Sequence, residues 1–378
     1  MSGTSDQSPQ AQALLERVRA HVREELRPLA EDIDRKRLYP EGWLREMGEL
    51  GGFAALAPVA DGGSGLGLAT QIAAVGAVGE ECGATAFMAW CQATCAWYLL
   101  KSSNRALRER LLGDVLHARL LAGTGMSNTV KHLSGLEQNR LQAVRTEGGF
   151  TVRGTLPWVS NIGAEHAFGV TAQVADGDGG GYVMFIARGN APGVSLRACP
   201  EFCAHEGTNT LGVRFDNAHI ADTEVLAQPA EFADYLARVK GGFMLLQSGM
   251  GLGLVQSCLE IMRDANLFAG EQNAFLDDTH DALQAELARL QARTMTLADA
   301  IDAGRADMLE VLRARAECSE LSLRAAQSAA LHCGAKGFVM RHPAQRRTRE
   351  AMFVAIITPS LRHLRKEIDA IERQRAGA

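Results

Sequence analysis

The sequence carries no acidic side chain between Glu350 and Glu367, although both flanks of this segment are rich in charge. It also lacks an uninterrupted apolar run of about 18 residues, the length that a membrane-spanning helix needs, so we expect no membrane partner. The N-terminus, MSGTSDQSPQAQ, is polar and has no apolar core of the kind found in secretion signals. We therefore expect a cytoplasmic protein.

An excess of positive charge is absent as well. The 378 residues include 39 Lys and Arg against 44 Asp and Glu, a formal net charge of -5, so we expect no nucleic-acid partner. Eight cysteines are present, and Cys91/Cys95 and Cys199/Cys203 each have a four-residue spacing. No second Cys or His pair with metal-ligand spacing follows either of them. Buried thiols in a reducing compartment explain this pattern better than a zinc site, and we predict no bound metal.

The balance of 47% hydrophobic and 22% charged residues is typical of a globular protein, and the length suggests two or three domains. The first third, residues 1–121, has helical periodicity. Apolar residues recur at steps of three or four from Leu14 to Ile33, and Pro28 is expected to kink this helix. We predict an N-terminal helical domain.

The period changes in residues 122–228. Segments such as GGFTVRGTLPWVS and AFGVTAQV alternate apolar and polar residues, which is typical of strands. DGDGGG, residues 176–181, has the composition of a hairpin turn. Several strands with short glycine turns predict an antiparallel β domain, a barrel or a sandwich.

Helical periodicity returns in residues 229–378. The leucines of the stripe Leu283–Ile301 share one helix face, and Met308–Leu331 predicts another long helix. Such stripes pack into a bundle, and their extent also predicts a homodimer or homotetramer. The fold class is α+β, with the order helical, β, helical.

Three motifs in this order resemble those of the acyl-CoA dehydrogenase family. They are LREMGELGGFAALAPVADGGSGLG, GGFTVRGTLPWVSNIGAEHAF and ALHCGAKGFVMRHPAQRRTRE, and the resemblance covers residues 10–370. It implies FAD between the β domain and the C-terminal helices, with an acyl thioester as substrate. In this family a carboxylate removes the substrate's α-proton while hydride passes from the β-carbon to the flavin N5.

The resemblance implies a set of cofactor-binding residues. The family's Trp-x-Thr corresponds to Trp158 and Ser160, whose hydroxyl is expected to donate to the flavin ring edge. A gapless count back from Trp158 matches a family serine that contacts the pyrophosphate with Ser134. The same count brings Ser127 and Asn128 to the flavin, although the rest of that loop motif is degraded.

The C-terminal part departs further from the family pattern. The arginine and glutamine that reach the FAD of a neighbouring subunit correspond to Ala265 and Leu331. Gly334, in the glycine turn, and Ser360, at a family threonine, remain as implied cofactor contacts. Lys240 stands where many members carry an arginine that helps to place the substrate.

The family's catalytic glutamate corresponds to Thr358, counted without gaps from Arg349 and Glu350. Some members carry the base on the first long helix of the C-terminal domain, but no Asp or Glu occurs here between Asp234 and Glu260. A positioned base contributes about 10²–10⁴-fold to such a reaction, and a threonine hydroxyl does not replace it. Two nearby histidines, His332 and His363, are weaker candidates for a replacement base.

Three functions stay open at this point. The first is an acyl-CoA dehydrogenase-like flavoenzyme with altered chemistry or a displaced base. The second is a flavin-dependent monooxygenase on the same fold, which HPAQRRTRE, residues 342–350, resembles. The third is a catalytically inactive binding or partner subunit that has kept the fold.

Overall fold

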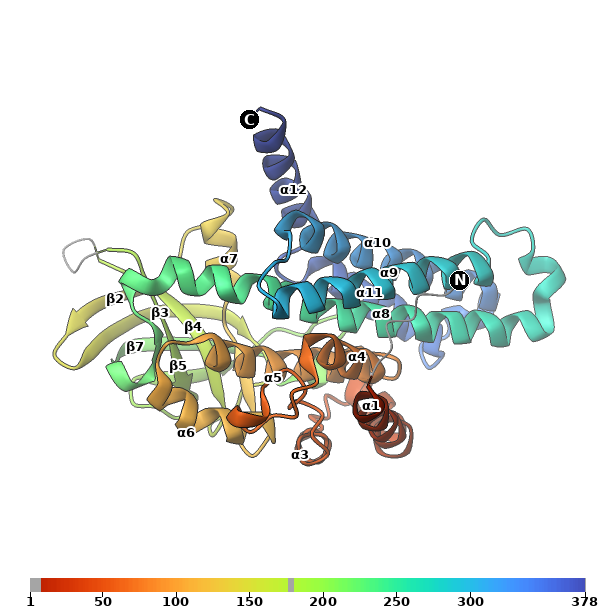
Figure 1. Cartoon of the computed structure of the whole chain (residues 1–378). Helices are drawn as coiled ribbons and strands as arrows, with labels where there is room; N and C mark the ends of the chain where they lie inside the picture. The colour runs from red at the N-terminus through yellow and green to blue at the C-terminus, as the bar shows by residue number, and fades with distance from the viewer. Residues whose placement is uncertain (1–7, 176–179, 378) are drawn as a thin grey trace.

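The computed structural model describes residues 8–175 and 180–377. Figure 1 shows the strands gathered at one end of the molecule. The N-terminal helices lie below and the long C-terminal helices run above them, away from the sheet. The order along the chain is helical, β, helical, as the sequence predicts. The predicted hairpin turn at residues 176–181 lies mostly outside the described residues.

The N-terminal helices surround one almost fully buried helix, α5. Its apolar residues are not confined to one face, which is typical of a helix enclosed on all sides. Pro28 lies in a 3-10 turn between α1 and α2, so the α-helix is interrupted where the sequence predicts a kink. The helices are α1 (Pro9–His21), α2 (Ala30–Arg35), α3 (Glu41–Glu49), α4 (Gly67–Gly79), α5 (Gly83–Lys101) and α6 (Arg105–Leu116).

The β domain is one mixed sheet and not the antiparallel barrel or sandwich that the sequence suggested. Its strand order is β6-β7-β3-β2-β4-β5-β8, and β1 pairs with β4. Most pairs are antiparallel, but β4 pairs in parallel with both β1 and β2. Alternation within a strand does not report the direction of its neighbour, which explains the error. The strands are β1 (Ala122–Thr124), β2 (Leu141–Thr146), β3 (Gly149–Val159), β4 (Ala167–Val174), β5 (Tyr182–Arg188), β6 (Val194–Ala198), β7 (Leu211–Ala221) and β8 (Val225–Ala227).

A long helix, α8, connects the β domain to the C-terminal bundle. The segment Pro229–Asn273 is long and apolar enough to cross a membrane, but 94% of its most apolar window is buried inside the molecule. It is therefore a core helix. A Cβ atom on Gly242 would lie 2.3 Å from the Trp97 ring, so glycine permits the close approach of α8 to α5. The remaining helices are α7 (Ser127–Leu133), α8 (Phe232–Asn273), α9 (His280–Asp302), α10 (Met308–Cys333), α11 (Pro343–Ile356) and α12 (Leu361–Ala376).

The leucine stripe of α9 is covered within the chain. Leu283, Leu287 and Leu290 are fully buried in the cluster that also contains residues of α8 and α10. The stripe therefore gives no support for self-association, because bundle packing already accounts for it.

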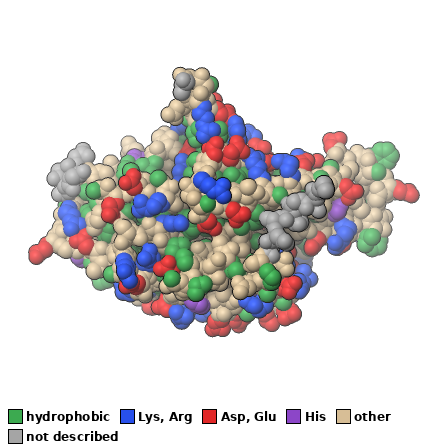
Figure 2. All heavy atoms as spheres, in the orientation of Figure 1, with side chains coloured by type: hydrophobic (Ala, Val, Ile, Leu, Met, Phe, Trp, Pro, Cys, Tyr) green, Lys and Arg blue, Asp and Glu red, His purple; other side chains and the backbone are tan. Residues whose placement is uncertain are grey.

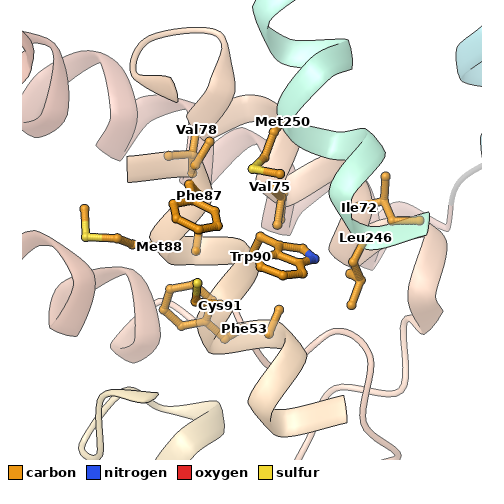
Figure 3. Close-up of a cluster of buried hydrophobic side chains, with 14 of the residues drawn as sticks. Phe53, Ile72, Val75, Val78, Phe87, Met88, Trp90, Cys91, Leu246 and Met250 are labelled. Carbon is orange, nitrogen blue, oxygen red and sulfur yellow. The ribbon is translucent and has the colours of Figure 1, made fainter. Parts of the chain in front are cut away.

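The helical core reaches the region between the domains through the aromatic residues of α5. Figure 3 shows Phe87 and Trp90 among buried side chains of α4 and α8, including Val75, Leu246 and Met250.

Figure 2 shows acidic and basic side chains intermixed on the visible face, with no single-sign patch. This agrees with the small net charge.

Candidate functional site

A cavity of about 640 Å³ lies where the β sheet meets α5 and the C-terminal helices. It brings together four of the residues predicted from the sequence: Ser127, Trp158, Ser160 and Thr358. Its wall is mostly aromatic and aliphatic, with a few hydroxyl groups. Such a composition is typical of a small-molecule or cofactor site.

The end of β3 supplies Trp158 and Ser160. Trp158 is 54% exposed, which is unusual for so large an apolar side chain, and Phe202 is its one aromatic neighbour within the described residues. Ser160 forms an isolated bridge with Thr124 at the end of β1, and Thr124 lines the same cavity. The indole face is thus free to cover a planar ligand beside two hydroxyl groups.

A chain of hydroxyl groups continues from Ser160 into the loop before β7. Ser160 Oγ lies 2.6 Å from Thr210 Oγ1, and Thr210 Oγ1 lies 2.7 Å from Thr208 Oγ1. Thr208 donates to the backbone carbonyl of His205 at 2.7 Å. A carbonyl oxygen only accepts, so Thr208 must receive its second bond from Thr210, and Thr210 must receive one from Ser160. The proton of Ser160 is then used within this series of hydrogen bonds, and Ser160 Oγ can only accept from a ligand in the cavity.

Thr358, which the sequence count matched with the family base, follows the end of α11 and lines the cavity. Its hydroxyl is 2.8 Å from that of Ser127, and its backbone carbonyl accepts a 2.9 Å hydrogen bond from Gln247 Nε2. Within residues 8–175 and 180–377, no Asp or Glu lines this cavity. The structure therefore supplies no carboxylate base there.

A buried arginine stands behind Thr358. Arg315 is fully buried and donates to Gln247 Oε1 at 3.0 Å and to the Val354 carbonyl at 2.8 Å. Burial lowers the pKa of its guanidinium, and no acidic partner for it occurs among the described residues. Gln247 thus connects a cationic side chain to the backbone that carries Thr358.

Ser134 and Lys240 line a second, smaller pocket of about 140 Å³. Phe243 borders both cavities. The Ser134 hydroxyl donates to Glu367 at 2.9 Å, and Lys240 donates to the same carboxylate at 2.9 Å. Although burial opposes it, hydrogen bonding to His363 together with Lys240 lowers the pKa of Glu367 to about 2. An anionic side chain therefore occupies the neighbourhood in which a pyrophosphate contact is predicted.

The other predicted residues lie outside the large cavity. Asn128 is buried, and its side-chain amide binds Glu137 Oε1 at 2.7 Å. His332 Nδ1 pairs with the Ser328 carbonyl at 2.7 Å. Four further predicted residues line neither pocket: His332, His363, Gly334 and Ser360.

Most residues of the large cavity were not predicted from the sequence, among them Thr124, His205 and Arg349. The gapless count assigned the cofactor loop to residues 128–135, but α7 forms a helix there, and Thr124 ends the preceding strand. Arg349 was used to align the C-terminal motif but was given no role. It forms a two-pronged ion pair with Asp34, at 2.6 and 2.7 Å. His205 belongs to no motif, and nothing in the sequence pointed to it.

Comparison with known proteins identifies relatives of this chain. Residues 8–119 match the acyl-CoA dehydrogenase N-terminal domain. Benzylmalonyl-CoA dehydrogenase of Aromatoleum aromaticum is 25% identical over 344 residues, which cover 88% of this chain and 90% of that protein.

Solved structures share the fold over the whole chain. Glutaryl-CoA dehydrogenase in complex with glutaryl-CoA has a TM-score of 0.90 at 21% identity, covering 99% of this chain and 97% of that one. PigA, solved with FAD and proline, has a TM-score of 0.86 at 14% identity, covering 99% and 100%. Residues 8–119 thus match an acyl-CoA dehydrogenase N-terminal domain, and the whole chain is similar in sequence to acyl-CoA dehydrogenases and has their fold.

Proposed function

We propose that this protein is a FAD-dependent oxidoreductase that acts on an acyl thioester, with chemistry altered by the missing catalytic carboxylate. The observation that carries the proposal is the large cavity, which is lined both by Trp158 and Ser160 and by the segment Ile356–Thr358 at the end of α11. The relatives named above are dehydrogenases of CoA thioesters, which supports the substrate class. The acyl group and its carrier stay open.

The residues of the cavity fit a flavin ring. Trp158 offers a free indole face, and Thr124 and Ser160 offer hydroxyl groups at one edge. PigA was solved with FAD, which supports the same cofactor here. When bound, FAD supplies a two-electron acceptor for the substrate's hydride.

The pyrophosphate of FAD is proposed to lie near Ser134. This contact competes with Glu367, which already accepts the Ser134 proton and is anionic at neutral pH. Lys240 and Lys366 lie beside this group, Lys366 donating to the Ser134 carbonyl at 2.8 Å. Two ammonium groups offset the repulsion between a diphosphate and one carboxylate.

The residues of this chain then hold the substrate rather than supply the family's base. The Thr358 hydroxyl is paired with Ser127 and has no basicity near neutral pH. His363 is engaged by Ser134 and Glu367, and His332 lies outside the cavity. Neither histidine is placed to accept a proton from a substrate in this cavity.

We propose further that the protein acts as a homodimer or homotetramer in the cytoplasm. Support comes from exposed apolar side chains near the ends of α8 and α10. Asn273 joins these ends by a 3.2 Å bond to the His332 carbonyl. The exposed side chains are Leu267, Phe268, Phe275, Leu331, Phe338, Val339 and Met340.

The cofactor part of the proposal is tested by flavin loading. The purified protein is reconstituted with FAD, and the Trp158→Ala variant is compared with Val144→Ala, which truncates an exposed side chain on β2. We expect a flavin spectrum in the parent and in Val144→Ala, and markedly lower occupancy in Trp158→Ala. Equal occupancy and an unchanged spectrum in all three would place the flavin elsewhere.

A further inference from the structure

Two charged side chains line the large cavity within the described part of the chain, and both are cations. They are Lys131 of α7 and Arg349 of α11. No Asp or Glu of the described residues lies in its wall, and Thr358, which the sequence count matched with the family base, is uncharged. The wall that was expected to carry a negative charge therefore carries positive charge instead.

Arg349 is already paired. Asp34 accepts two hydrogen bonds from its guanidinium, at 2.6 and 2.7 Å. The Gln345 side chain and the Cys203 carbonyl each accept a further one at 2.9 Å. The charge of Arg349 is thus balanced by a carboxylate that does not line the cavity, so it adds little attraction for an ion inside.

Lys131 is far less occupied. Its ammonium group lies 3.8 Å from Glu137 Oε2, farther than the usual distance of about 2.7–3.2 Å between hydrogen-bonded nitrogen and oxygen. The other oxygen of that carboxylate accepts a 2.7 Å hydrogen bond from Asn128. Lys131 donates no hydrogen bond to any described residue, and its side chain is 31% exposed. Its three N–H donors are therefore left for a ligand.

Lys131 shares the cavity wall with the residues near which the acyl group is expected. It follows Ser127 by four residues on α7, and residues at this spacing share a helix face. The Ser127 hydroxyl is 2.8 Å from that of Thr358, and all three residues line the large cavity. Arg315, buried behind Thr358 without an acidic partner among the described residues, adds positive potential to the same region.

A carboxylate on the acyl group is the anion that fits this place. The phosphate of a CoA thioester lies at the far end of the pantetheine arm from the acyl group. The pyrophosphate of FAD is proposed near Ser134, which lines the smaller pocket. An anion beside Thr358 therefore has to be part of the acyl group itself. Ammonium and carboxylate groups also form stronger hydrogen bonds than neutral partners do.

We propose that Lys131 selects the substrate: its ammonium group binds a carboxylate on the acyl part of the thioester, so that the cavity prefers acyl groups that carry a carboxylate to neutral ones. This rests on the proposed function. The preference is electrostatic and is expected to weaken as the salt concentration rises.

The test is equilibrium binding of pantetheine thioesters, which carry no phosphate, to the FAD-loaded protein, reduced and kept anaerobic so that no turnover occurs. The probes are the thioesters of succinate and glutarate and of their monoamides, which have the same shape but no charge. In the parent we expect at least one acid to bind about tenfold more tightly than its amide. Lys131→Met keeps the apolar stem of the side chain and should abolish this difference, whereas Lys131→Arg should keep most of it.

Lys36→Met is the matched control, because Lys36 also has an ion pair, with Asp32, but does not line the cavity. It should keep the preference. Lys131→Gln repeats the test if the methionine variant does not fold. No preference in the parent, or a preference that survives loss of the ammonium group, overturns the inference. So does a loss of flavin from Lys131→Met with the preference intact, which would assign the charge to the cofactor. If none of the four thioesters binds, the proposed function fails and the inference with it.

Discussion

At the scale of single residues, the hydrogen-bonded hydroxyl groups of Ser160, Thr210 and Thr208 determine whether Ser160 would donate to a bound flavin or accept from it. We first expected this hydroxyl to donate to the ring edge. The chain ends on the His205 carbonyl, so the proton of Ser160 is directed to Thr210 and Ser160 meets the ligand as an acceptor. An acceptor at the edge of a bound flavin would favour the reduced ring, which carries more N–H groups than the oxidised ring.

Breaking this series of hydroxyl hydrogen bonds should reverse the preference for the reduced flavin. In Thr210→Val, Ser160 loses its acceptor and becomes free to donate to the oxidised ring. We expect the two-electron midpoint potential of the bound flavin to fall by on the order of 10–30 mV, the equivalent of one hydrogen bond. Spectroscopic redox titration measures this, with Thr94→Val, a buried threonine of α5, as control. A higher or unchanged potential would mean that Ser160 already donates.

At the scale of elements, a polar cluster at Glu367 is one of the attachments of α12 to the molecule. Figure 1 shows this helix projecting from the bundle, and its Glu367 accepts hydrogen bonds from Ser134 after α7, from Lys240 of α8 and from His363 of its own helix. The helix is otherwise mostly exposed, with His363 and Leu364 as its buried residues among those described. Its docking therefore depends in part on the charge of this carboxylate, beside the exposed ion pairs Arg365–Glu320 and Arg375–Asp307.

This dependence predicts a response to acid. Folding lowers the pKa of Glu367 from 4.5 to about 2, so its stabilisation is complete above pH 4.5 and is lost as the pH falls toward 2. At pH 7, Glu367→Gln should lower the free energy of unfolding by on the order of 1–3 kcal/mol. It should also reduce the acid sensitivity between pH 4.5 and 2.

Denaturant unfolding at several pH values measures both effects. Glu372→Gln, which removes an exposed ion pair of the same helix with Arg313, serves as control and should change little. Parallel pH profiles for the parent and Glu367→Gln would contradict this role.

Elements were the part of the structure that the sequence predicted best. Periodicity predicted a long helix over Met308–Leu331, which the structure has as Met308–Cys333, and a strand within residues 148–160, which it has as Gly149–Val159, because each buries one face or stripe. The parallel pairing of β4 is set by residues far apart in sequence, which local patterns do not record.

Site residues on matched motifs, such as Trp158 and Thr358, line one cavity. His205 and Thr124 escaped because their roles arise only from long-range contacts.

At the scale of the whole molecule, the exposed apolar side chains at the far end of α8 predict self-association. Phe268 and Phe275 are 90% and 91% exposed, and an exposed apolar patch of this kind marks an interface. We expect light scattering at micromolar concentration to report a dimer or tetramer. The double variant Phe268→Glu/Phe275→Glu should shift it toward monomer, whereas Val144→Glu on β2 should not. A parent that is monomeric throughout would contradict the proposed assembly.

The most direct test of the proposed function is single-turnover flavin reduction with and without a carboxylate at residue 358. The FAD-loaded parent, Thr358→Glu and Thr358→Gln are mixed anaerobically with a panel of acyl-CoA thioesters. Thr358 is 7% exposed, so burial should raise the pKa of the new carboxylate and strengthen it as a base. We predict flavin reduction at least about tenfold faster in Thr358→Glu than in the parent or Thr358→Gln, for at least one thioester. No gain with any thioester, in a variant that folds and holds FAD, would contradict the claim that the missing carboxylate is what separates this protein from an ordinary dehydrogenase.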